Sequence, residues 1–264
     1  MPEPLKDPKK VMPAPTAWLF DEIRTNPLLG RFILIGGTGL SLHIGHRMSE
    51  DLDLITLESK LPRTALKELQ RQLESSGHQI EHRINPAAYD DFQISGMELE
   101  DSQQDWVVDS SVKLTFFAGE PKHAKLLATT NRNDNPEGGI KVASFQELCQ
   151  LKAIVTASRS KSRDWLDLFI LERDHQFGVA KWKDAFDKAG LSPMDFEIAL
   201  NRMCRGLLSE DDEGYDTLIP NPPNIEEMKN RFRSLRKAYE TNLASIRAKE
   251  MGGDHGNSDT PSNP

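Results

Sequence analysis

The stretch that decides the fold is FILIGGTGLSLHIGHRMSEDLDLIT, Phe32 to Thr56. It opens with a compact apolar run rich in β-forming residues, which predicts a buried strand ending at Gly36 and Gly37. A segment of helical length follows, and a second predicted strand carries Asp51 and Asp53. The stretch therefore predicts a strand, a helix and a second strand. The glycines lie between the first strand and the helix, and the two carboxylates lie on the second strand.

The glycine pair lies where an anion can approach the backbone. Because glycine has no Cβ, a phosphate can reach the N–H groups at the positive end of the following helix. Thr38 adds a hydroxyl at the same place. A tight turn between strand and helix explains the same glycines without any ligand, so the pair alone leaves both interpretations open.

The two aspartates are separated by one residue. Side chains two apart on a strand project from the same face, so Asp51 and Asp53 can converge on a hard cation such as Mg²⁺. Isolated acids of this kind more often only face water. Their place directly after the glycine turn favours a metal site beside a phosphate site.

A second informative stretch is FQELCQLKAIVTASRSKSRDWLDLFIL, residues 145–171. Lys152 falls on a mostly apolar helix face, and Asp164 and Asp167 share one face of a helix that is otherwise apolar and therefore predicted to be buried. Buried carboxylates need partners, and Lys152, Arg159 or Arg163 can supply them. Such ion pairs either serve a ligand or only lock two helices together.

The whole chain predicts an α+β fold. Its 264 residues can bury a core without metal or disulfide staples. We expect a disordered N-terminus at 1–15, an α/β module with a mixed sheet at 16–143, a helical region completing the site at 144–250, and a disordered tail at 251–264.

The charge and cysteine content limit the function. A formal net charge of −8 argues against a protein that coats nucleic acid, so nucleic-acid contact needs a local basic patch. The helix predicted at 225–249 has an apolar stripe and a basic face, which is either simply solvated or docks RNA backbone. Cys149 and Cys204 lack metal-ligand spacing, and no apolar run could span a membrane, so a cytoplasmic protein without membrane contact is expected.

Both stretches resemble motifs of one family. Residues 32–56 resemble the first motif of the AbiEii/AbiGii-type nucleotidyltransferases, a polymerase-β-like family that includes abortive-infection (phage-defence) toxins and toxins that modify tRNA. Residues 145–171 resemble a later motif of that family. The resemblance implies a polymerase-β-like fold, NTP as substrate, Mg²⁺ or Mn²⁺ as cofactor, tRNA as acceptor through the basic C-terminal helix, and a cognate antitoxin as a candidate partner.

The resemblance also implies residue roles. It places the triphosphate against Gly36, Gly37 and Thr38, the metal on Asp51 and Asp53, and a phosphate contact on Lys152 with Asp164 or Asp167 as its partner. The implied catalytic set is Asp51, Asp53, Lys152 and Asp164. His46 and Arg47 match as well, and they are expected to shape the loop or contact phosphate, with a solvated loop as the alternative.

One departure from the family pattern keeps the function open. Polymerase-β-like enzymes usually add a third carboxylate from a later strand, but that strand here offers Lys113 or Thr115, and Asp109 lies aside in a predicted hairpin. Three functions remain: a toxin that modifies RNA, a transferase that acts on a protein or small-molecule hydroxyl, and an inactive nucleotide-binding module.

Overall fold

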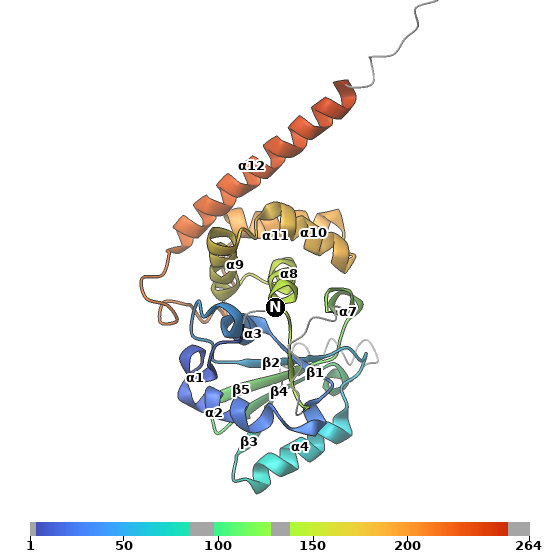
Figure 1. Ribbon diagram of the computed structural model, residues 1–264, viewed down its shortest axis with the longest axis vertical. Helices are drawn as coiled ribbons and strands as arrows, with labels where there is room; N and C mark the ends of the chain where they lie inside the picture. The colour runs from blue at the N-terminus through green and yellow to red at the C-terminus, as the bar shows by residue number, and fades with distance from the viewer. Residues whose placement is uncertain (1–3, 85–97, 128–137, 253–264) are drawn as a thin grey trace, which may run out of the picture.

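One mixed six-stranded sheet organises the protein (Figure 1). The computed structural model describes residues 4–84, 98–127 and 138–252. The strand order is β3-β4-β5-β2-β1-β6, with β2 parallel to β5, β1 parallel to β6 and the other pairs antiparallel. The strands are β1 (Phe32–Ile35), β2 (Leu52–Thr56), β3 (Ile80–Arg83), β4 (Gln103–Val108), β5 (Val112–Phe117) and β6 (Lys141–Val142).

Helices are interspersed with the strands in the first half of the chain and dominate the second half. The first group is α1 (Pro8–Val11), α2 (Ala14–Ile23), the 3-10 helix η1 (Pro27–Leu29), α3 (Gly36–Ile44), α4 (Arg63–Ser75), α6 (Leu99–Ser102) and α7 (Pro121–Leu126). The second group is α8 (Phe145–Val155), α9 (Ser162–His175), α10 (Val179–Ala189), α11 (Pro193–Arg205) and α12 (Ile225–Gly252). The predicted α+β class is confirmed.

The two faces of the sheet bury separate apolar clusters. On one face, Leu54 packs with Phe20 of α2 and Leu69 of α4. On the other face, Ile33 and Ile55 belong to the cluster that contains the buried residues of α8 to α11. Figure 1 shows α8 to α11 on one side of the sheet and α2 and α4 on the other. The helical region therefore shares its core with the sheet.

The start of the chain differs from the expected disorder of residues 1–15. Within the described residues, α1 ends at Val11, and Val11 and Met12 are buried in the core. The Lys6 N–H also donates to the Leu42 carbonyl at 2.6 Å. Proline content suggested disorder, but two apolar side chains anchor the segment.

The other end of the chain is only partly described. Helix α12 continues to Gly252, and residues 253–264 of the expected disordered tail lie outside the described residues, as does most of the strand expected around residues 92–100. At Leu99–Ser102 the structure has a short helix in place of that strand. None of the described helices is both long and apolar enough to cross a membrane.

Candidate functional site

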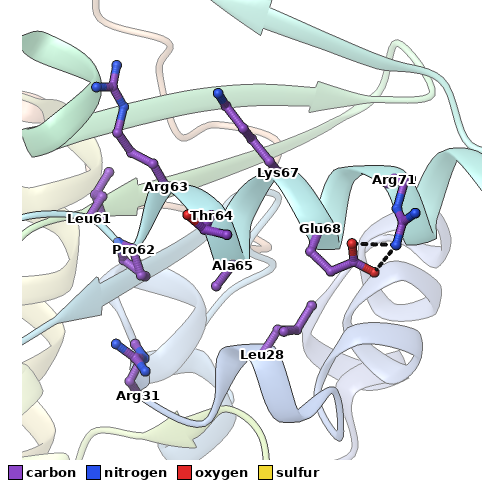
Figure 2. A pocket seen from close by; sticks show the side chains of 10 residues that line it. All are labelled: Leu28, Arg31, Leu61, Pro62, Arg63, Thr64, Ala65, Lys67, Glu68 and Arg71. Atoms are coloured by element: carbon purple, nitrogen blue, oxygen red, sulfur yellow. Dashed lines mark hydrogen bonds and ion pairs between the residues drawn. The ribbon is translucent and has the colours of Figure 1, made fainter.

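Two cavities of the protein differ in whether predicted site residues line them. A hollow of about 840 Å³ beside α4 is lined by residues such as Arg31, Arg63 and Lys67 and contains none of the predicted site residues (Figure 2). A cleft of about 680 Å³ between the sheet and helices α8, α9 and α11 contains most of them. Its lining includes Gly37, Arg47, Asp51, Asp53, Lys152 and Asp164. We call it the catalytic cleft, after the predicted catalytic residues in its lining.

Asp51 and Asp53 form the acidic side of the catalytic cleft. Asp53 lies on β2, paired with Ile35 of β1 on one side and with Thr115 of β5 on the other. Burial and the neighbouring Asp51 carboxylate raise the pKa of Asp53 to about 6. Burial also raises the pKa of Asp51, although Lys113 opposes the shift. Two partly desolvated carboxylates that disfavour each other's charge are an environment suited to a bound cation.

The glycine pair is explained by these functional side chains. Gly36 has φ +71°, and a Cβ there would collide with the Asp53 carboxylate. A Cβ at Gly37 would collide with the guanidinium of Arg47. The glycines therefore let a carboxylate and a guanidinium approach the first turn of α3, which has no side-chain cap. Sequence reasoning assigned the space to phosphate and missed these two contacts.

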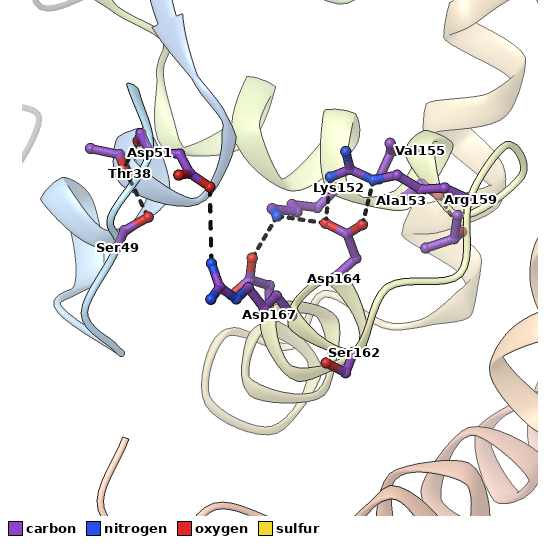
Figure 3. Close-up of polar contacts among 12 residues, drawn as sticks. Thr38, Ser49, Asp51, Lys152, Ala153, Val155, Arg159, Ser162, Asp164 and Asp167 are labelled. Atoms are coloured by element: carbon purple, nitrogen blue, oxygen red, sulfur yellow. Dashed lines mark hydrogen bonds and ion pairs between the residues drawn. The ribbon is translucent and has the colours of Figure 1, made fainter. Parts of the chain in front are cut away.

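The structure places the Thr38 side chain against the loop that carries Asp51. Its side chain is buried, and its hydroxyl bonds to the backbone carbonyl of Asp51 and lies 2.8 Å from the Ser49 hydroxyl (Figure 3). Neither Thr38 nor Gly36 lines the catalytic cleft. Thr38 thus fixes the loop that carries Asp51, and its hydroxyl is already committed to that loop.

A buried network of charges forms the opposite side of the catalytic cleft. We call Arg47, Lys152, Arg159, Asp164 and Asp167 the charge cluster. Figure 3 shows the Lys152 ammonium between the two carboxylates, 2.8 Å from Asp164 and 2.6 Å from Asp167. Arg47 binds both oxygens of Asp167 at 2.7 and 3.2 Å, and Arg159 binds both oxygens of Asp164 at 2.8 and 3.1 Å.

The charge cluster keeps its carboxylates ionised. Burial alone would raise the pKa of Asp164, but Lys152 and Arg159 outweigh burial and hold that pKa below its usual value. Burial opposes the charges at Asp167 too, yet Arg47 and Lys152 hold its pKa well below the usual range. Three cations against two carboxylates leave one surplus positive charge beside the catalytic cleft.

The His46 and Arg47 side chains in the loop before the aspartates are buried. Arg47 is 6% exposed, and the His46 side chain is nearly inaccessible, with Nε2 2.7 Å from Asp167. Burial lowers the pKa of His46, so the neutral imidazole donates to the carboxylate. The alternative of a solvated loop is therefore wrong.

Arg163 does not pair with Asp164 or Asp167. Instead it binds Glu50 at 3.0 Å and Glu213 at 3.1 Å, acids outside the charge cluster.

The structure shows how the residues that were considered for a third carboxylate are placed. Thr115 is the β5 partner of Asp53, and its hydroxyl donates at 2.9 Å to Asp105 on β4, the next strand. Asp109 binds the His78 ring at 2.7 Å and does not line the catalytic cleft. Within the described residues, no group of three or more acidic, histidine or cysteine side chains could hold a metal. Two carboxylates still fit Mg²⁺, which often takes its other ligands from substrate phosphates and water.

Sequence reasoning missed part of the cleft rim. The acidic segment around Asp212 forms this rim: Asp211, Asp212 and Glu213 line the catalytic cleft, and Asp211 and Glu213 are exposed there. The Asp212 carboxylate accepts the Ser162 N–H at the start of α9 at 2.8 Å, and Lys161 binds Asp211 at 2.7 Å. The basic turn between α8 and α9 was the signal for this pairing, because a dense run of cations attracts acids from elsewhere in the chain.

The sequence of this chain is similar to a known protein family and to one protein from another organism. Residues 18–251 match the family model described as "Nucleotidyl transferase AbiEii toxin, Type IV TA system". An uncharacterized protein of Aquifex aeolicus (strain VF5) is 26% identical over 214 residues, which cover 79% of this chain and 87% of that protein.

Two solved structures are distantly similar. A crystal structure from H. pylori, described as a nucleotidyltransferase, has a TM-score of 0.48 at 17% identity and covers 88% of this chain and 96% of its own. MenT4, a nucleotidyltransferase toxin of Mycobacterium tuberculosis H37Rv, has a TM-score of 0.43 at 15% identity and covers 84% of each chain.

Proposed function

We propose that this chain, which belongs to the AbiEii nucleotidyl transferase toxin family, transfers a nucleoside monophosphate from an NTP to a hydroxyl of RNA in a metal-dependent reaction. The observation that carries the proposal is the catalytic cleft itself. An acidic pair at the start of β2 faces a surplus of positive charge from the charge cluster across one cavity, beside the N-terminal turn of α3. A metal-bound triphosphate needs an acidic side and a basic side of this kind.

Asp51 and Asp53 are the residues that would hold Mg²⁺ or Mn²⁺. Their carboxylates are hard oxygen ligands, and the raised pKa of Asp53 reflects a site that disfavours uncompensated negative charge. When bound, the metal would neutralise phosphate charge and lower the pKa of the acceptor hydroxyl. Asp53 must lose its proton to serve as a ligand, and without a metal its pKa is about 6.

The chain's own residues position and neutralise the substrate. Lys152 and Arg47 are locked by carboxylates, so their positive charges are fixed before substrate arrives and need no reorganisation. Arg159 is half exposed and extends the same positive side toward solvent. The first-turn amides of α3 add a helix N-terminus to which an anion is attracted. Lys152 therefore acts on the phosphates, and Asp164 and Asp167 act through Lys152.

tRNA is the acceptor that we propose, with a protein or small-molecule hydroxyl as the second candidate. The family description names a toxin of a toxin–antitoxin system, which supports a cognate antitoxin as a partner. Cys149 and Cys204 are buried free thiols, a state that suits a reducing cytoplasm.

The decisive experiment is nucleotide transfer by the purified protein. Each α-labelled NTP is incubated with protein, Mg²⁺ or Mn²⁺, and total tRNA, beside Asp53→Ala. Label that enters tRNA with wild type and not with Asp53→Ala supports the proposal. Label found by mass spectrometry on a protein or small molecule supports the second candidate. NTP binding by calorimetry without turnover on any acceptor would instead leave a nucleotide-binding module.

A further inference from the structure

The last turn of α11 joins the catalytic cleft to a second groove. Arg202 lines the catalytic cleft and donates to the Thr156 carbonyl at 3.0 Å. Arg205, three residues later, lines a groove of about 370 Å³ between α11 and α12. Residues three apart on a helix are neighbours on its surface. The positive charges of the two cavities are therefore adjacent along one edge of α11.

Cations dominate this second groove. Its lining consists of Asn201, Cys204, Arg205, Arg233, Arg236, Lys237 and Glu240, and we call it the α11–α12 groove. Arg236 is neutralised by Glu197 at 2.9 Å and Glu240 at 2.7 Å. By contrast, Arg205 and Lys237 are exposed, and neither forms an ion pair or side-chain hydrogen bond with the described part of the chain. Two unopposed charges in a chain of net charge −8 form the local basic patch that phosphate binding requires.

Some cations of the basic face expected on the C-terminal helix already have partners within the protein. Arg231 is committed to Glu172 at 2.7 Å, and Arg233 donates to the Cys204 carbonyl at 2.8 Å. Among the described residues, Lys237 thus keeps a free positive charge on the groove side of α12, as the exposed Arg247 and Lys249 do nearer the C-terminal end of the helix. Met228 and Phe232 are buried in the core, which holds this part of α12 in place beside α11.

We infer that the α11–α12 groove binds phosphates of the RNA acceptor's backbone while the reacting hydroxyl enters the catalytic cleft. This inference rests on the proposed RNA-modifying function. A row of cations leading away from the cleft from Arg202 to Arg205 and Lys237 suits a strand of regularly spaced phosphates. An acidic protein segment is disfavoured because the groove lining presents charged and amide groups and no large apolar side chain for a partner to cover.

The test is RNA affinity as a function of salt. The variant Arg205→Glu/Lys237→Glu is compared with Lys9→Glu/Lys67→Glu, which makes the same charge change at two exposed lysines, Lys9 on α1 and Lys67 on α4. Figure 2 shows Lys67. Fluorescence anisotropy with labelled tRNA should show at least ~10-fold weaker binding for the groove variant, and a slope of log K against log salt reduced by about 1.5 to 2. The control variant should keep the wild-type affinity and slope.

Nucleotide binding and transfer are measured on the same proteins. An unchanged NTP affinity in the groove variant, with a raised KM for tRNA, supports the inference. Equal RNA affinity in the groove variant and wild type, or an equal loss in the control variant, overturns it, as does transfer to a protein acceptor by a chain that binds no RNA. Absence of transfer to any acceptor refutes the proposed function, while the binding comparison still reports on the groove.

Discussion

Two aspartate pairs, one lining the catalytic cleft and one in the charge cluster beside it, have the same side chains in opposite environments. Asp51 and Asp53 lie on the sheet side, and the pKa of each is raised. Asp164 and Asp167 lie on α9 at 1% and 0% exposure, and the pKa of each is lowered. The α9 pair has cations within 2.8 Å, whereas the cation that reaches the sheet pair within the described residues is Arg163, 3.9 Å from Asp51.

This difference shows that the presence or absence of built-in cation partners distinguishes buried carboxylates that stabilise the fold from buried carboxylates that can bind a metal ion. Carboxylates whose cations are built into the fold have little affinity left for an incoming ion, and they hold Lys152 in place instead. Carboxylates buried without such partners favour a cation that arrives from solution. Four predictions test this division, from the largest expected effect to the smallest.

Asp53→Ala should lower nucleotide transfer by at least ~10³-fold, because it removes a ligand that compensates charge at the reacting phosphate. The protein should stay folded, since the variant also removes an unpaired, partly buried carboxylate. Transfer assays and thermal unfolding measure the two effects. Asp105→Ala, two strands away in the same row, is the control: an equally inactive Asp105→Ala would mean that the site needs three carboxylates.

Asp167→Ala should lower the free energy of unfolding by about 3–5 kcal/mol, because Arg47 and Lys152 would remain buried without their shared partner. Denaturant unfolding followed by circular dichroism measures the loss. Asp174→Ala, an exposed acid on the same helix paired with Arg173, should change stability by less than about 0.5 kcal/mol. Similar values for both variants would show that the charge cluster contributes nothing structural.

Gly36→Ala should cost about 1–3 kcal/mol of stability from backbone strain, and it should also reduce transfer. Its φ is +71°, and the added Cβ would displace the Asp53 carboxylate. Gly77→Ala is a matched control, because Gly77 has φ +99° but no atom within 4 Å of an added Cβ. Both variants should lose stability, and only Gly36→Ala should lose activity. Full activity in Gly36→Ala would contradict the proposed seat for Asp53.

The smallest effect concerns pH. The folded pKa of Asp53 is about 6, above the unfolded value of about 3.9, so folded protein retains this proton longer and loses stability as pH rises toward 6. In EDTA, the stability gain of Asp53→Asn over wild type should therefore grow by about 1 kcal/mol between pH 5 and 7.5. Chemical unfolding at both pH values measures it. A gain that shrinks with pH would show that Asp53 is ionised without difficulty.

Much of the fold was readable from local patterns. The apolar run before Gly36 predicted β1, and the second predicted strand of the same stretch, which carries Asp53, corresponds to β2. The N-terminal segment was misjudged because the anchoring of Val11 and Met12 depends on surfaces that only the assembled core provides. Local composition contains no information about such distant contacts.

The catalytic cleft was readable in its residues and not in their contacts. The pattern placed Lys152 and Asp164 correctly as candidate partners, because a buried charge demands an opposite one. It could not reveal that Arg47 binds Asp167, which lies 120 positions away in the sequence. Nor could it reveal that the Thr38 hydroxyl donates to the backbone carbonyl of Asp51. Pairings between distant segments depend on topology, which spacing along one helix or strand does not encode.

The bond between Arg47 and Asp167 has a consequence for how the molecule can come apart. It crosses from the loop before β2 to the middle of α9, so separating the sheet from the helical half would take from Arg47 its carboxylate partner, while Asp167 would keep Lys152. A chain cut near residue 144 should thus yield halves that are unstable alone and reassociate when mixed. Amide protons on both sides should exchange with solvent in one cooperative step.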